Sequence, residues 1–216
     1  MSIFSRHKTE LVSPDQALPG RSERNFNLSE RHRVLDAPLV TDEAPAGYEV
    51  AFFGLGCFWG AEEIYWQIPG VYSTSVGYAG GSTPNPSYEE VCSGRTAHTE
   101  AVRIVFDPAR VSYSDLVKKF FEVHDPTQGM RQGNDIGTQY RSAIYYTTPE
   151  QEQVARDLTR VYGEELKRRR LGDITTEVRV APTYYYAEDH HQQYLAKNVN
   201  GYRCHSNTGV KFPAGA

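Results

Sequence analysis

One stretch of this chain restricts its fold more than any other: a short apolar run that ends at a glycine and leads directly into a helical segment. Residues Glu49–Leu55 form the run, and its apolar character predicts a buried strand. Gly56 allows a sharp turn, and a helix is expected from about Cys57 to Trp66, because Pro69-Gly70 would stop it. A buried strand followed at once by a helix indicates a fold in which helices pack against a sheet.

The rest of the chain repeats this alternation of strands and helices, but irregularly. Two long polar loops, 82–98 and 125–139, interrupt it, and the chain ends in a coil-like tail rich in Gly, Asn and Pro. These features favour an α+β fold: a mixed β-sheet with packed helices, as a two-layer α/β sandwich with a ferredoxin-like core, over a regular doubly wound sheet. Further strands are expected at Val71–Tyr78, Glu100–Phe106, Arg141–Tyr146 and Glu177–Ala181, and further helices at Ser112–His124 and from Pro149 to about Arg170.

The first 47 residues differ from the rest because they are polar and show no sustained hydrophobic period. We expect residues 1–47 to form a long N-terminal arm, and residues 48–216 to form the catalytic domain with its C-terminal tail. The short apolar pairs Leu11-Val12 and Leu39-Val40 favour an arm that wraps over the domain, over one that is fully disordered.

Composition narrows the classes of function. The 216 residues carry a net charge of −4, so no basic excess points to nucleic acid. No apolar run is long enough for a signal peptide or a membrane span, which predicts a cytoplasmic protein that binds no membrane. In that reducing compartment the three cysteines would not form a disulfide framework, so each is a buried thiol, a metal ligand or a reactive group. A monomer is expected.

Cys57 is the best candidate for a reactive thiol. At a strand-to-helix turn it would lie near unpaired backbone N–H groups and the positive end of the helix dipole, which should lower its pKa. Gly56 and Gly60 leave room for a substrate to approach. Phe58 and Trp59 are not both expected to point inward, and an exposed aromatic pair would suit a small apolar group such as a methyl. The alternative is that Cys57 is simply a small buried apolar residue.

Three other interpretations use the same residues. A dinucleotide loop is disfavoured, because the Gly54-x-Gly56-x-x-x-Gly60 spacing is one residue too long and two aromatic side chains would crowd a pyrophosphate. A cysteine hydrolase would need a histidine base, for which His98, His190 and His191 are available. A metal-binding or structural module would use His190, His191, Cys204 and His205, although the chain has no tight Cys-x-x-Cys pair.

Several segments, in a fixed order, together resemble the peptide methionine sulfoxide reductase A family. The first is Gly56-Cys57-Phe58-Trp59-Gly60, and the resemblance covers roughly residues 50–205. The arm before it is similar to that of the longer bacterial members. The other matching segments are Val76–Gly81, Pro86–Gly94, His98–Val102, His124–Pro126, Gln132–Ser142 and Ala187–Gln192.

The resemblance implies a role for each candidate residue. Cys57 would be the nucleophile and become a sulfenic acid. Glu100 would be the acid, consistent with a carboxyl whose pKa is raised by desolvation near an aromatic-lined site. The sequence alone favours a solvated carboxylate at a strand end, and the resemblance reverses that interpretation. The family is specific for the S epimer of the sulfoxide. The substrate-binding residues would be Phe58 and Trp59 at the methyl group, and Tyr88, Tyr140 and Asp135 at the oxygen.

The resemblance also implies how the enzyme is recycled. The family places a resolving cysteine in the C-terminal tail, and here that position is Cys204, which would form a disulfide with Cys57. Many relatives carry another cysteine a few residues later, but Val210-Lys211-Phe212-Pro213 contains none. Thioredoxin would therefore act directly on the Cys57–Cys204 disulfide as an external reductant, with no bound cofactor or metal. Cys92 is interpreted as structural, since one resolving thiol is enough.

Overall fold

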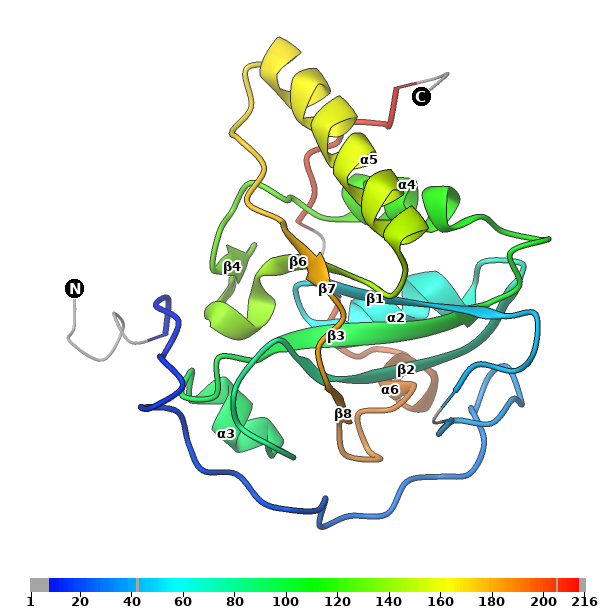
Figure 1. The fold of residues 1–216 in the computed structure, drawn as a ribbon, viewed down its shortest axis with the longest axis vertical. Helices are drawn as coiled ribbons and strands as arrows, with labels where there is room; N and C mark the ends of the chain where they lie inside the picture. Colours follow the sequence, from blue (N-terminus) through cyan, green and yellow to red (C-terminus); the bar gives the residue numbers. More distant parts are fainter. Residues whose placement is uncertain (1–7, 42, 205, 214–216) are drawn as a thin grey trace.

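A six-stranded sheet runs through the molecule, with the strand order β7-β6-β1-β3-β2-β8 (Figure 1). The computed structural model describes residues 8–41, 43–204 and 206–213. Neighbouring strands are antiparallel except for β6 and β7, which are parallel, so the sheet is mixed, as predicted. The strands are β1 (Glu49–Leu55), β2 (Val71–Ala79), β3 (Thr99–Phe106), β6 (Ser142–Tyr146), β7 (Glu177–Val180) and β8 (Tyr184–Tyr186).

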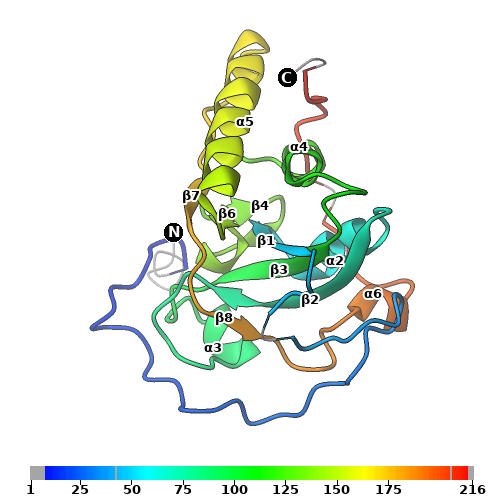
Figure 2. The ribbon, with the colours of Figure 1, turned by 45° about the vertical axis from the view of Figure 1, so that its right-hand side comes forward.

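The predicted helices form close to their expected bounds. Helix α4 begins after Ser112, which forms a capping box with Asp115, and helix α5 begins after the N-cap Thr148 with Pro149 in its first turn. The described helices are α2 (Phe58–Trp66), α3 (Tyr88–Cys92), α4 (Tyr113–Val123), α5 (Pro149–Arg168) and α6 (Tyr194–Lys197). Figures 1 and 2 show α4 and α5 on one side of the sheet.

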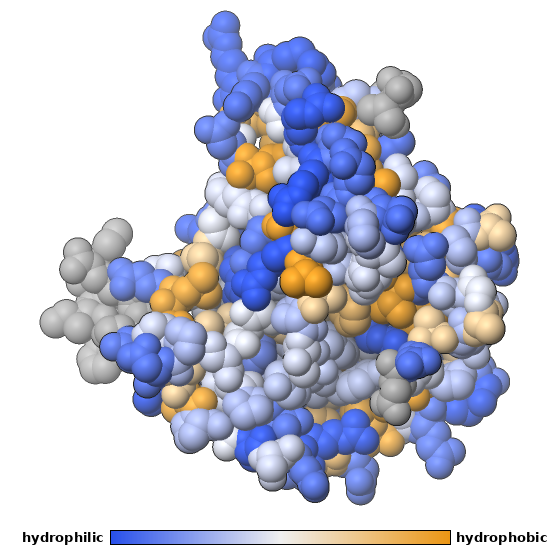
Figure 3. Space-filling model, in the orientation of Figure 1, coloured by the Kyte–Doolittle hydropathy of each residue, from blue (hydrophilic) through white to orange (hydrophobic). Residues whose placement is uncertain are grey.

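Alternation along β1 decides which face of the sheet these helices cover. Phe53 points toward them, and its ring lies 5.5 Å from that of Tyr65 on α2 and 5.4 Å from that of Phe120 on α4. Phe52 points to the opposite face, where it meets Tyr184 at 5.4 Å. Helix α5 buries one stripe, including Tyr162, against the same core as Phe53, and Figure 3 shows mainly hydrophilic residues over this helix. The result is the two-layer sandwich expected from the sequence.

The two long loops and the tail contain short elements that the sequence reading did not predict. Loop 82–98 contains α3, whose capping box of Ser87 and Glu90 is a readable Ser-x-x-Glu signal. Loop 125–139 contains the hairpin β4 (Arg131–Gln132) and β5 (Asp135–Ile136), followed by the 3₁₀ helix η1 (Thr138–Tyr140). Among the described helices, none has the length and apolar composition needed to cross a membrane.

The described part of the N-terminal arm follows the surface of the domain, below β8 and α3 in Figure 1. Leu39 anchors it, with 1% of its surface exposed, but Leu11 is 48% exposed and is not the anchor that its apolar character suggested. His32 is the anchor that the sequence reading missed, because its ring is buried and bonded to Thr74 of β2 at 2.8 Å. The division into an arm over 1–47 and a catalytic domain over 48–216 stays a prediction.

Candidate active site

Cys57 occupies the N-cap position of α2, directly after β1. The backbone N–H groups of Trp59 and Gly60 lower the pKa of the thiol, as the helix start predicted. Burial has the larger and opposite effect, and the neighbouring carboxyl of Glu100 adds to it, so the pKa of Cys57 lies well above its usual range. The expectation of a lowered pKa is therefore wrong for the resting site, because desolvation outweighs the helix terminus.

Glu100 lies on β3 and is almost fully buried, so it is not the solvated carboxylate of the alternative interpretation. Its Oε2 accepts a hydrogen bond of 3.0 Å from the backbone N–H of Phe58, the first residue of α2. Burial raises the pKa of Glu100 to about 8; the Phe58 N–H opposes this rise, and the charge of Asp135 adds to it. At neutral pH the carboxyl is therefore protonated, and it is available as a proton donor beside Cys57.

The two aromatic residues after Cys57 differ in how deeply they are buried. Phe58 is only 1% exposed and packs on Tyr78, with ring centres 5.9 Å apart, so the expected exposure of the pair is wrong for Phe58. The apolar side chains of β2 account for this burial. Trp59 is half-buried, stacks on Tyr194 at 3.8 Å and donates Nε1–H to Nδ1 of His191 at 3.1 Å. One aromatic wall is thus held rigidly on both sides.

The two phenols come from the short elements inside the long loops. Tyr88 is the first residue of α3, and its backbone N–H donates to Oε1 of Glu188 at 2.8 Å. Tyr140 is the last residue of η1. Burial and the nearby Glu100 raise the pKa of both phenols, so each keeps its proton and is able to donate it in a hydrogen bond.

Asp135 lies on β5 at the same site, where its charge raises the pKa of both Cys57 and Glu100. Burial raises the pKa of Asp135 itself. Its Oδ2 accepts a hydrogen bond of 3.1 Å from the hydroxyl of Tyr202, which belongs to the C-terminal tail. The tail therefore reaches the residue that was expected to face the oxygen of the substrate.

Cys204 and Cys57 line one small crevice of about 20 Å³, together with Gln132 and His124. All three cysteines are free thiols. The thiol of Cys204 lies 3.6 Å from the carbonyl oxygen of Gln132, within reach of a weak hydrogen bond. Cys92 ends α3 on another side of the site, and burial raises its pKa to about 11; its structural role stays a prediction.

The sequence reading missed several residues that hold the site in shape. Glu188 binds both the backbone of Tyr88 and the hydroxyl of Tyr78, the latter at 2.9 Å. The amide of Gln192 binds both the N–H and the carbonyl of Val76, at 2.9 and 2.8 Å. Both belong to the Ala187–Gln192 segment, whose acidic and amide side chains were the available signal.

The histidines considered for a hydrolase have other partners. His98 accepts from the N–H of Gly81 at 3.0 Å and contacts the carbonyl of Thr83 at 2.7 Å, while His191 contacts Trp59. Within the part of the chain that the structure describes, no histidine forms a hydrogen bond with Cys57. His205, considered for a metal module, lies outside the described residues, and among those that are described no group of three or more His, Cys, Asp or Glu could hold a metal ion.

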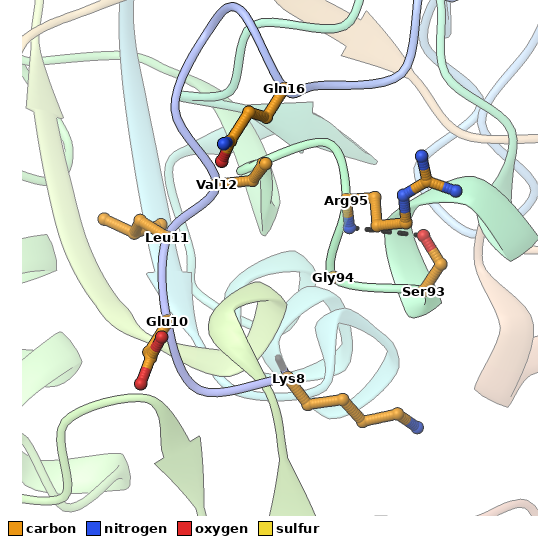
Figure 4. Close-up of a pocket in the computed structure, with 8 residues that line it drawn as sticks. All are labelled: Lys8, Glu10, Leu11, Val12, Gln16, Ser93, Gly94 and Arg95. Atoms are coloured by element: carbon orange, nitrogen blue, oxygen red, sulfur yellow. Dashed lines mark hydrogen bonds between the residues drawn. The ribbon is translucent and has the colours of Figure 1, made fainter. Parts of the chain in front are cut away.

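A larger hollow lies beside the site, between the arm and the segment that follows α3 (Figure 4). It measures about 640 Å³ and is lined by Lys8 and Leu11 on the arm and by Arg95 on the facing segment, among others. The carbonyl of Lys8 accepts a hydrogen bond of 2.8 Å from the N–H of Thr138, the first residue of η1. The arm thus contacts the element that carries Tyr140.

Several known proteins are similar to this chain. A model of the peptide methionine sulfoxide reductase family matches residues 49–213. The peptide methionine sulfoxide reductase MsrA of Salinispora arenicola is 56% identical over 215 residues, 99% of this chain and 97% of that protein. That of Pseudomonas savastanoi pv. phaseolicola is 57% identical, covering 96% of each chain. The solved structure of methionine sulfoxide reductase A of Corynebacterium diphtheriae is similar with a TM-score of 0.84 and 48% identity, covering 94% of this chain and 99% of that one.

Proposed function

Because this chain belongs to the peptide methionine sulfoxide reductase family, we propose that it reduces methionine S-sulfoxide, in proteins and as the free amino acid, through Cys57. The observation that carries the residue assignment is the buried carboxyl of Glu100, bonded to the N–H of Phe58 at 3.0 Å directly beside the thiol. Its raised pKa leaves it protonated at neutral pH, which is the state that the reaction needs.

In the reductive step, the sulfur of Cys57 attacks the sulfoxide sulfur. An S–S bond forms and the S–O bond of the substrate breaks, and the oxygen leaves as water with one proton from the thiol and one from Glu100. The water then attacks the sulfur of Cys57 and the S–S bond breaks. The thioether leaves, Cys57 becomes a sulfenic acid, and the Glu100 carboxylate takes back a proton. Glu100 supplies a proton to the sulfoxide oxygen, which is otherwise a poor leaving group. Tyr88 and Tyr140, both protonated, donate hydrogen bonds to that oxygen, and Asp135 holds it or a water molecule.

Trp59 forms the wall against the methyl group of the substrate, and the buried Phe58 supports this wall, since both rings pack on His191. Exchanging the methyl and the oxygen, as in the R epimer, would place a polar atom against the aromatic rings and remove it from the phenols. That exchange leaves hydrogen-bonding groups unpaired on both sides, which is the physical basis for selecting the S epimer.

In the recycling step, the thiol of Cys204 attacks the Cys57 sulfenic acid. An S–S bond forms and the oxygen leaves as water. Thioredoxin, an external dithiol, then reduces the disulfide, and no bound cofactor takes part. The free thiols in the crevice support this cycle. We place the protein in a reducing compartment, the cytoplasm, and assign catalysis to residues 48–216.

The test is to supply the enzyme with a peptide that contains methionine S-sulfoxide, with dithiothreitol or thioredoxin as reductant. We expect the wild type to form methionine continuously and Cys57→Ser to form none. Chromatographic measurement of methionine decides the outcome. No turnover by the wild type, or undiminished turnover by Cys57→Ser, would contradict the proposal.

A further inference from the structure

Arg203, the residue directly before Cys204, is clamped by a carboxylate. Its Nε donates to Oε2 of Glu63 at 2.6 Å, and its Nη2 donates to Oε1 at 2.7 Å. Both side chains are mostly buried, with 28% and 21% of their surfaces exposed. A guanidinium that engages both oxygens of one carboxylate has a fixed orientation, unlike a pair joined by a single contact.

This clamp joins the tail to the helix that carries the other thiol. Glu63 lies on α2, the helix that begins directly after Cys57. The remaining nitrogen of the guanidinium, Nη1, donates to the carbonyls of Val199 and Gly201, at 3.0 and 3.2 Å, and so fixes the turn after α6. The backbone on the N-terminal side of Cys204 is therefore tied to the same rigid helix as Cys57.

On its other side, the tail is held by contacts to other parts of the molecule. The hydroxyl of Ser206 accepts from the amide of Gln128 at 3.0 Å, and that of Thr208 lies 2.9 Å from the hydroxyl of Tyr162. Val210 is 3% exposed, and its carbonyl accepts from the hydroxyl of Tyr162 at 2.9 Å. Phe212 stacks on the ring of Tyr162 at 5.5 Å. None of these contacts is made to α2, so loss of the Arg203–Glu63 pair would let the thiol sample a larger volume, which lowers its effective concentration at Cys57.

We propose that the Arg203–Glu63 pair is a latch that positions Cys204 for attack on the Cys57 sulfenic acid. This inference rests on the proposed function and adds to it a pair of positioning residues. The latch takes no part in the bond changes: the Cys204 thiol and the sulfenic acid still yield a disulfide and water. It acts by keeping the resolving thiol in the crevice that both cysteines line.

The experiment separates formation of the sulfenic acid from formation of the disulfide. Reduced enzyme is oxidised in a single turnover, once with a methionine S-sulfoxide peptide and once with hydrogen peroxide, which oxidises Cys57 without the substrate reaction. The variants are Arg203→Leu, Glu63→Leu, the conservative Arg203→Lys and the charge exchange Glu63→Arg/Arg203→Glu. The control is Arg160→Leu, which removes an ion pair with Glu164 on α5, away from both thiols.

We expect methionine formation to stay within about twofold of the wild type, and disulfide formation to slow about 10-fold in either leucine variant, because the tether no longer holds the thiol in reach. Arg203→Lys should slow it less, the charge exchange should restore part of the rate, and Arg160→Leu should leave it unchanged. Free-thiol titration and mass spectrometry at timed quenches give these rates.

Unchanged disulfide rates in the leucine variants would overturn the latch. A charge exchange as slow as the single variants would also overturn it, since the pair itself would then not matter. The peroxide arm keeps this test independent of the proposed function. If the wild type forms no methionine, and disulfide formation after peroxide is slower in Arg203→Leu than in the wild type, the function is refuted and the latch is supported. Thermal unfolding of each variant identifies a folding defect.

Discussion

Two carboxyls are buried in this region, one beside the reactive thiol and one on the helix that follows it, and they differ in what surrounds them. Glu62 on α2 and Glu100 on β3 are 0% and 1% exposed, and burial raises the pKa of Glu62 to about 7 and that of Glu100 to about 8. Glu62 accepts three hydrogen bonds, from the N–H and the amide of Gln193 and from the hydroxyl of Thr74, at 2.7, 2.8 and 3.0 Å. Glu100 accepts one backbone hydrogen bond, from Phe58.

The contrast shows that a raised pKa does not by itself identify a catalytic acid. The oxygens of Glu62 are committed to a network that continues through Thr74 to His32 on the arm, and this network fixes Gln193 just before Tyr194, the residue that stacks on Trp59. Glu100 keeps an oxygen available beside Cys57. Burial raises the pKa of both carboxyls, but only Glu100 is able to deliver its proton to a substrate.

The largest expected effect is on the reductive step. Glu100→Gln keeps an acceptor for the Phe58 N–H but removes the proton donor, so we expect methionine formation in a single turnover to fall by about 100- to 10,000-fold. Glu62→Gln, equally buried, should reduce it by no more than a few-fold. Equal losses in the two variants would remove the distinction between the two carboxyls.

The pH dependence of the same step sharpens the comparison. Glu100 must be protonated to act, so the single-turnover rate should fall as pH rises through about 8, the pKa of the buried carboxyl. The Glu62→Gln variant should keep this alkaline decline at the same pH. Rapid-quench rates between pH 6 and pH 10 measure this decline. A decline that shifts to another pH in Glu62→Gln would mean that Glu62, and not Glu100, is the group that titrates.

The smallest expected effect is on stability. Glu100 has a folded-state pKa of about 8 against an ordinary 4.5, so the folded wild type holds a proton that the unfolded chain has lost, and its stability falls as pH rises from about 4.5 to about 8. Glu100→Gln lacks this loss, so its melting temperature relative to wild type should rise across that window.

Glu62→Gln serves as the matched variant in the same melting experiment. Its new amide turns an N–H toward a donor of Gln193, and we expect this to cost about 1–3 kcal/mol of unfolding free energy. Scanning calorimetry at pH 6 and pH 9 checks both variants. A difference in stability between Glu100→Gln and wild type that stays the same at pH 6 and pH 9 would contradict the assigned pKa.

Much of the fold followed from local patterns in the chain. The apolar run before Gly56, the capping residues Ser112 and Thr148 and the alternation in Glu100–Phe106 each act through neighbouring residues, and each produced its predicted element. Helix α3 was missed although its local capping box of Ser87 and Glu90 could be read from the sequence; the bond from its first N–H to Glu188 is a distant contact that the sequence pattern does not show.

The sequence by itself determined that Cys57 lies at a strand-to-helix turn, that Glu100 lies on a strand and that one thiol follows in the tail, because backbone conformation depends mostly on adjacent residues. Only the tertiary structure decided the chemical state of these groups. Desolvation depends on what segments far along the chain pack around a group, and it reversed the expected pKa of Cys57 and raised that of Glu100 to about 8. Packing against β2 buried Phe58. The same long-range packing committed Glu62 to Gln193 and Thr74 and placed Cys204 beside Cys57.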